Sequence, residues 1–263
     1  MLGIDFIINR GVMKRSVFDW GGNIAAFIAV IFINGLANGI PLNGQNTGEI
    51  SAKYPSLFTP AGFTFSIWGL IYLSLTAFVI YQALPAQRGN QTLAKITPLF
   101  IANCVANAAW IFVWHYDLLW LSLLLMAAIL LTLIQIYRTL LAAGPAGSKS
   151  EWLFLRLPFS LYTGWITVAS IANISCVQIA MGWDNAGLSA VDWTILKLAI
   201  AGAVGATVIL RLRDIPYVLI IAWAAFGIAS KQVAMPEVAG AATMLSVLAV
   251  LLAVAEALRK SPG

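Results

Sequence analysis

The stretch NCVANAAWIFVWHY, residues 103 to 116, places amide side chains and tryptophans in a segment that otherwise reads as hydrocarbon. Asn103 and Asn107 are four residues apart, and so are Trp110 and Trp114. Because residues three or four apart share a helix face, Asn107, Trp110 and Trp114 are expected to project from adjoining parts of one face. Such a face offers flat apolar walls beside hydrogen-bonding groups, which suits a flat, mostly apolar ligand with a few polar atoms.

The composition of the chain indicates an all-α integral membrane protein. Of its 263 residues, 61% are hydrophobic and 10% are charged, whereas a soluble domain carries about 25% charged residues. Long apolar runs recur down the whole sequence, and a span in lipid must satisfy its own backbone hydrogen bonds, which favours helices. The net charge of +5 is scattered between the apolar runs, so nucleic acid is excluded as a partner.

Hydropathy, read with Pro, Gly and charge as punctuation, predicts about eight transmembrane helices. The third and fourth runs are nearly continuous, and we divide them at His115 to Asp117 because an undivided helix would be twice the length that a bilayer needs. The predicted spans are 22–42, 60–84, 96–116, 118–141, 153–181, 193–211, 215–231 and 237–257.

Basic residues test this count, because cytoplasmic loops and helix ends are enriched in Lys and Arg. With eight spans, twelve of the 15 basic residues fall on one face, which we expect to be cytoplasmic with both termini on it, in a membrane of the bacterial inner-membrane type. The twelve are Arg10, Lys14, Arg15, Arg88, Lys95, Arg138, Lys149, Arg156, Arg211, Arg213, Arg259 and Lys260.

The spans divide the chain into regions. Residues 1–21 are expected to form a cytoplasmic N-terminal segment and 22–181 a five-helix bundle. A loop at 182–192 leads to three additional transmembrane helices at 193–257, and 258–263 form a cytoplasmic tail.

Amides inside the predicted spans have two interpretations. Asn34 and Asn38 are four apart in the first span, Asn103 and Asn107 in the third, and Asn173 lies in the fifth. Each can hold helices together, at about 0.6 to 2 kcal/mol per interaction. Alternatively, amides next to tryptophans can bind a ligand. We assign Asn34, Asn38, Asn103 and Asn173 to helix packing and Asn107 to ligand binding.

Three segments together carry a family resemblance. FTPAGFTFSIWGLIY (58–72), NCVANAAWIFVW (103–114) and LPFSLYTGWITVASIAN (157–173) resemble the signature helices of the TspO/MBR family, the tryptophan-rich sensory proteins related to the mitochondrial translocator protein. The family pattern of a Trp with a Tyr four residues later is matched by Trp68 and Tyr72. An Asn three residues before an aromatic is matched by Asn107 and Trp110.

The third match is Trp165, followed eight residues later by Asn173. The sequence departs from the pattern at Thr59, which replaces the first of two prolines, and at Phe63, where a Trp is common. The resemblance covers about 22–181, so the last three spans have no counterpart in the short family members.

The resemblance implies a five-helix bundle with a pocket near one end, closed by the loop between the first two helices. Family members bind porphyrins, related tetrapyrroles, sterols and benzodiazepine-type compounds, and transport, signalling and light-dependent porphyrin breakdown have been proposed for them. The ligand-binding residues are expected to be Trp68, Tyr72, Asn107, Trp110, Trp114 and Trp165.

The predicted role is therefore that of a membrane receptor, sensor or carrier for a porphyrin-type tetrapyrrole or a sterol. No motif requires a cofactor, a metal or a catalytic residue, although the resemblance leaves light-dependent porphyrin breakdown open. A secondary transporter, or a scaffold that docks a partner through the last three helices, is the alternative. The expected partners are the bilayer and the small molecule, and a homodimer is left open.

A histidine, a lysine and a polar loop carry three further predictions. His115, the only histidine, is interpreted as interfacial, since no converging ligands accompany it. Lys197 is expected to extend to the membrane interface rather than to act inside a span. The polar loop 43–59, NGQNTGEISAKYPSLFT, is expected to fold over the pocket as a lid.

Overall fold

A computed structural model describes residues 14–40, 42–183 and 185–259, except that the side chain of Asn38 lies outside the description. Arg10 and Lys260, which the charge analysis used, also lie outside it. Every regular element in the described ranges is helical. The protein is thus an all-α, multi-pass integral membrane protein, as predicted.

Seven helical spans of the described residues are long and apolar enough to cross a membrane. They are α1 (Val17–Gly39), η2 with α3 (Gly62–Ser66, Ile67–Ala83), α4 (Gln91–His115), α5 (Leu119–Ala142), α6 continuing through a π-helical turn into α7 (Lys149–Glu151, Trp152–Arg156, Leu157–Ala180), α8 (Ala190–Leu212) and α10 (Pro236–Arg259). The eighth predicted span is α9, Ile215–Lys231, whose 17 residues lie at the lower end of the usual range.

Helix ends follow local capping chemistry. α1 begins five residues before its predicted start because Ser16 and Asp19 form a capping box. α4 begins at Gln91, where Asn90 accepts hydrogen bonds from the next turn. The division between α4 and α5 lies where it was predicted, at Asp117, which has a positive φ of 53°.

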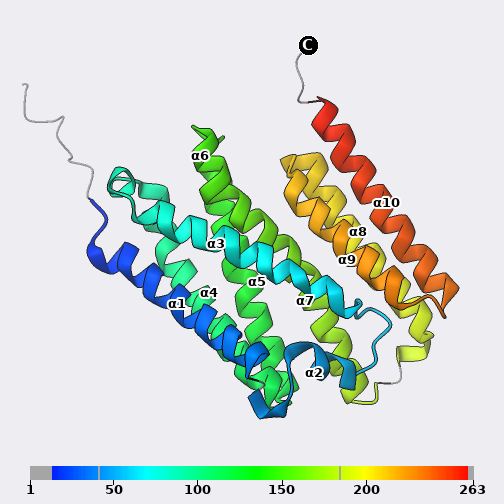
Figure 1. The fold of residues 1–263 in the computed structure, drawn as a ribbon. Helices are drawn as coiled ribbons and strands as arrows, with labels where there is room; N and C mark the ends of the chain where they lie inside the picture. Colours follow the sequence, from blue (N-terminus) through cyan, green and yellow to red (C-terminus); the bar gives the residue numbers. More distant parts are fainter. Residues whose placement is uncertain (1–13, 41, 184, 260–263) are drawn as a thin grey trace, which may run out of the picture.

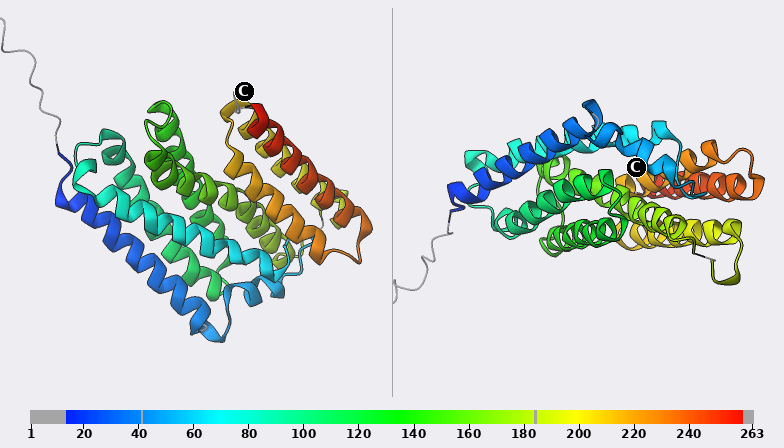
Figure 2. Two further views of the ribbon diagram at one scale, coloured as in Figure 1. Left: turned by 45° about the horizontal axis from the view of Figure 1, so that its top comes forward. Right: turned by 90° about the horizontal axis from the view of Figure 1, so that it is seen from below.

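The helices form two groups joined along α7. α1, α3, α4, α5 and α7 make a five-helix bundle, and α8, α9 and α10 make a second group that joins it through contacts of α9 with α7 and η2 (Figures 1 and 2). The start of α1 and the end of α10 lie at the same end of the molecule (Figure 1).

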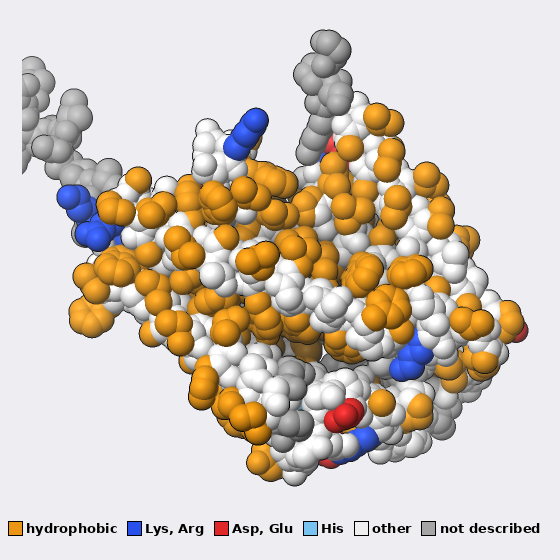
Figure 3. Space-filling view, viewed as in Figure 1, with side chains coloured by type: hydrophobic (Ala, Val, Ile, Leu, Met, Phe, Trp, Pro, Cys, Tyr) orange, Lys and Arg blue, Asp and Glu red, His pale blue; other side chains and the backbone are white. Residues whose placement is uncertain are grey.

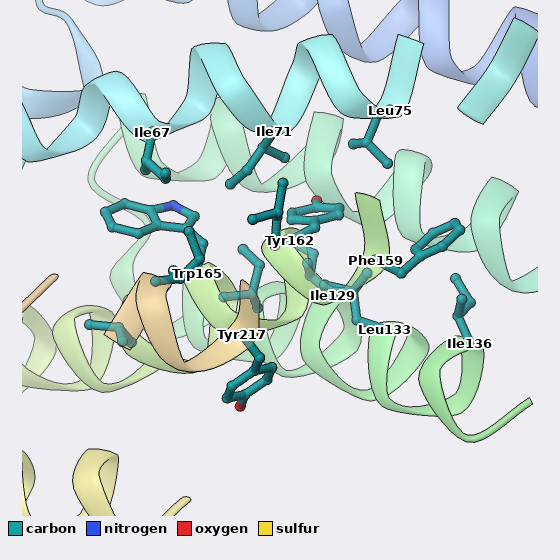
Figure 4. Close-up of a cluster of buried hydrophobic side chains, with 14 of the residues drawn as sticks. Ile67, Ile71, Leu75, Ile129, Leu133, Ile136, Phe159, Tyr162, Trp165 and Tyr217 are labelled. Carbon is teal, nitrogen blue, oxygen red and sulfur yellow. The ribbon is translucent and has the colours of Figure 1, made fainter. Parts of the chain in front are cut away.

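Large apolar side chains fill the space between α3, α5, α7 and α9 (Figure 4). Phe159 packs edge-on against Phe78, with ring centroids 4.8 Å apart. Tyr162 and Trp165, further along α7, continue this core toward the other end of α3. The core therefore sets the positions of aromatic residues that line the site described next.

Candidate functional site

A cavity of about 880 Å³ opens between α1, α3, α4 and the segment that links α1 to α3. Figure 3 shows a hollow on this face, with isolated charged side chains around it on an otherwise apolar and uncharged surface. Its lining includes Asn34, Asn46, Thr47, Glu49, Ser51, Thr59, Pro60, Phe65, Trp68, Tyr72, Asn107, Trp110 and Lys231.

Two aromatic stacks stand at the cavity: Trp68, Tyr72 and Trp110 line it, and Trp114 lies behind Trp110. Trp68 and Tyr72, four residues apart on α3, stack with ring centroids 5.2 Å apart and an interplanar angle of 21°. Trp110 stacks on Trp114 of α4 at 5.2 Å and 16°. Helical spacing predicted the contact of Trp110 with Trp114, and the family pattern paired Trp68 with Tyr72; in both pairs, side chains four residues apart meet on one helix face.

A smaller space of about 60 Å³, the inner pocket, adjoins the cavity and shares Trp68, Asn107 and Trp110 with it. Trp114 and Trp165 line the inner pocket, and each is 3% exposed. Trp165 lies edge-on to Trp68 at 6.2 Å. The six residues expected to bind a ligand are thus brought together around two connected spaces.

Asn107 has a structural role that the sequence analysis missed. Its Oδ1 accepts a hydrogen bond from Asn34 Nδ2 at 3.0 Å, and its Nδ2 donates to the Tyr162 hydroxyl at 2.8 Å. This chain of side chains connects α1, α4 and α7. Asn107 lines the cavity, but both its amide oxygen and its amide nitrogen already form hydrogen bonds with other residues of the protein.

The amides expected to join helices do so where the structure describes them. Asn103 Nδ2 donates to Thr132 Oγ1 of α5 at 2.9 Å. Asn173 Nδ2 donates to Ser122 Oγ at 3.0 Å, and its Oδ1 accepts from the Trp110 indole nitrogen at 3.2 Å. Asn173 therefore joins α7 to α5 and also orients one wall of the cavity.

Some polar atoms around the two spaces are buried without a hydrogen-bond partner in the described part of the chain. They are the Tyr72 hydroxyl, the Trp165 indole nitrogen and the Thr47 hydroxyl. Tyr72 and Thr47 line the cavity, and Trp165 lines the inner pocket. Leaving a buried polar group unpaired costs about 1 to 3 kcal/mol, so a ligand able to pair with these groups would recover that free energy.

The segment predicted as a lid covers the cavity and contains a short helix, α2 (Thr47–Lys53). Asn46 caps this helix, accepting hydrogen bonds from Gly48 and Glu49. Ile50 is fully buried against the cluster of Trp114 and Cys176. The cap thus stabilises α2 itself, and the buried Ile50 anchors the segment to the bundle.

The lid segment is also tied to the turn between α4 and α5. Asp117 accepts a hydrogen bond from Lys53 Nζ at 2.8 Å and another from the Tyr54 hydroxyl at 3.0 Å. Burial, together with this hydrogen bond, raises the pKa of Tyr54, so its hydroxyl keeps its proton up to alkaline pH. These contacts are at the surface, where an ion pair is worth about 0.2 to 1 kcal/mol, so opening the lid here costs little.

His115 and Lys197 were both expected at the membrane interface. His115 is the last residue of α4, at the end of the span where it was expected. Its side chain is fully buried, with Nδ1 2.7 Å from the Ile111 carbonyl, and the lid segment lies against it, where Asn43 Nδ2 donates to its carbonyl at 3.0 Å. Lys197 Nζ donates to Ser175 Oγ and Gln178 Oε1, which joins α8 to α7. Across the described ranges, no cluster of His, Cys, Asp and Glu could hold a metal ion.

At the opposite end of α1, the structure has a buried polar cluster that the sequence analysis did not predict. Arg15 donates to the Gln82 side chain at 2.7 Å and to Thr97 at 3.1 Å. Asn23 Nδ2 approaches the same two acceptors at 3.2 Å. The cluster joins α1, α3 and α4 at the end away from the cavity.

Fold and site together define a multi-pass helical membrane protein with an aromatic cavity near one end of its bundle. The model of the family described as TSPO-like protein matches residues 19–255, and the chain belongs to this family. The match extends past the five spans that carry the resemblance and includes α8, α9 and most of α10. Membership supports a role as a membrane receptor or sensor. No curated protein and no solved structure matches the chain significantly.

Proposed function

We propose that the protein is a membrane receptor that binds a flat tetrapyrrole-type ligand in the cavity beneath the lid. The observation that carries this proposal is the pair of aromatic stacks, Trp68 with Tyr72 and Trp110 with Trp114. Flat aromatic ligands gain offset-stacking and edge-on contacts from such walls, beyond simple burial of apolar area. A sterol lacks an aromatic ring system and would gain only the free energy of burying its apolar area.

The dimensions of the site are consistent with this ligand class. Small-molecule sites have volumes of about 300 to 1,000 Å³ and combine apolar walls with a few polar groups. The cavity, at about 880 Å³, falls within that range. The unpaired groups of Tyr72 and Trp165 are suited to the polar atoms of such a ligand, because each can donate a hydrogen bond.

In this proposal the lid segment opens to admit the ligand, and closure of α2 over the cavity reports occupancy to the non-cytoplasmic side. We place both termini on the cytoplasmic side, because cytoplasmic segments of membrane proteins are enriched in Lys and Arg. Asn107 orders the wall through Asn34 and Tyr162 rather than serving as the main polar contact.

Quenching of intrinsic tryptophan fluorescence by protoporphyrin IX in detergent tests the proposal, with correction for inner-filter absorption. Saturable micromolar quenching that weakens in the Trp68→Phe, Trp165→Phe double variant is expected. The matched control is Trp183→Phe, Trp193→Phe, a pair in mutual contact at 4.9 Å that lines neither space. Unsaturable quenching that is equal in all three proteins would contradict the proposal. If a sterol displaced protoporphyrin IX and other porphyrins did not, the ligand class would be sterols rather than tetrapyrroles.

A further inference from the structure

Lys231 brings a positive charge to the cavity from outside the five-helix bundle. It is the last residue of α9, its side chain is exposed, and it lines the cavity. An exposed residue that also lines a cavity lies at its mouth. No other Lys or Arg lines this cavity in the described part of the chain.

The position of Lys231 is fixed by close packing of α9 against the turn that leads into α3. The amide of Ala61 donates to the Gly227 carbonyl at 3.0 Å, and the Trp223 indole nitrogen donates to the Thr64 carbonyl at 2.9 Å. Gly227 and Lys231 are four residues apart and share this helix face. The backbone of Lys231 is therefore held beside the cavity by contacts that belong to the fold, and its side chain lines the cavity from there.

The charge of Lys231 has no ion-pair partner among the residues that the structure describes. Glu49 also lines the cavity, but its Oε2 accepts a hydrogen bond from the Asn46 amide at 2.8 Å in the capping box of α2. A lone cation at the edge of an apolar space attracts an anion, because partial exclusion of water strengthens the electrostatic interaction.

Building on the proposed function, we propose that the ligand carries a carboxylate arm and that Lys231 binds this arm at the mouth of the cavity. The aromatic walls hold the flat body of the ligand, while the ammonium group of Lys231 fixes which end points outward. α9 would then determine specificity, selecting flat anions over neutral molecules such as sterols.

The experiment compares protoporphyrin IX with its dimethyl ester, which has the same ring system without the charges. Affinities are measured by tryptophan quenching for wild type, Lys231→Met, Lys231→Gln, Lys231→Arg and the control Lys95→Met, an exposed lysine that does not line the cavity. The acid-to-ester affinity ratio is compared between variants, so that partitioning of each compound into detergent cancels.

Lys231→Met and Lys231→Gln are expected to lower the acid-to-ester affinity ratio about tenfold, which is the affinity that one charge-assisted hydrogen bond contributes. The affinity for the ester should be unchanged. Lys231→Arg and Lys95→Met should keep the wild-type ratio. Saturable binding with the same ratio in all five proteins would overturn the carboxylate inference and leave the proposed function standing. Absence of saturable binding of either compound to any of the proteins would overturn both.

Discussion

The side chain of Asn107 lies between Asn34 and Tyr162, accepting from the first at 3.0 Å and donating to the second at 2.8 Å. All three residues are buried or nearly so, and each comes from a different helix. An amide in this position stabilises the bundle wall before any ligand arrives. Its effect on binding is therefore expected to follow from its effect on the fold.

Asn107→Ala should lower the free energy of unfolding by about 1 to 3 kcal/mol, because it leaves polar groups of Asn34 and Tyr162 unpaired in a buried site. Thermal unfolding in detergent measures this. Tyr162→Phe, which removes only one of the two hydrogen bonds, should show a smaller loss. An Asn107→Ala protein that is as stable as wild type but binds protoporphyrin IX poorly would instead make Asn107 a direct ligand contact.

Tyr72 is expected to behave in the opposite way. Its hydroxyl is buried and has no hydrogen-bond partner among the described residues, so Tyr72→Phe should leave the unfolding temperature unchanged or raise it. Binding of protoporphyrin IX should weaken by about 0.5 to 1.5 kcal/mol if the ligand pairs with this hydroxyl. Both quantities can be measured on one sample, and loss of stability without loss of affinity would show that the group serves the fold.

The sequence predicts the fold well because membrane spans have a strong signal. Apolar runs bounded by charge, Pro and Gly predicted the bounds of α9, Ile215–Lys231, to the residue, where Asp214 caps the start and Pro216 lies in the first turn. The starts of α1 and α4 were missed by about one turn, because their first turns are polar and are set by Ser16 and Asn90 rather than by hydropathy.

From residue spacing alone, the site could be predicted only where its geometry is local, and it was the family resemblance that grouped Trp68, Asn107 and Trp165 from three helices. Trp68 with Tyr72, and Trp110 with Trp114, are neighbours through helical spacing alone. Lys231 is far along the chain from the other residues that line the cavity, so no spacing rule relates it to them. The same holds for the pairing of Arg15 with Gln82, which depends on how α1 packs on α3.

Opening of the lid segment can be tested by weakening its surface contacts with Asp117, which come from Lys53 and Tyr54. Asp117 has a positive φ, which Asn tolerates well, so Asp117→Asn should keep the turn while weakening the contacts with Lys53 and Tyr54. Trypsin should then cleave after Lys53 faster than in wild type, and bound protoporphyrin IX should slow the cleavage in both proteins.

Lys53→Arg is the matched control, because it keeps both the charge and a trypsin site and should be cleaved at the wild-type rate. Cleavage that is equally fast in wild type and Asp117→Asn, and unaffected by ligand, would mean that this segment does not close over the site.

Gly227 tests how the second group of helices supports the cavity. A Cβ atom at this position would lie 2.0 Å from Thr64 Oγ1 and 2.9 Å from Thr64 Cβ, so Gly227→Ala must push η2 away from α9. Overpacking of this kind costs about 1 to 3 kcal/mol, which should lower the unfolding temperature in detergent. Since Lys231 and Pro60 line the same cavity on the two sides of this contact, affinity for protoporphyrin IX should fall as well.

The matched control is Gly240→Ala in α10, where an added Cβ meets no atom within 4 Å. There the substitution should be neutral or stabilise by up to about 1 kcal/mol, because Ala loses less backbone entropy in a helix than Gly. If Gly227→Ala lowered stability without changing affinity, α9 would brace the fold without shaping the cavity. Equal behaviour of the two variants would mean that η2 can move away from α9 at no cost, which the hydrogen bonds from Ala61 and Trp223 oppose.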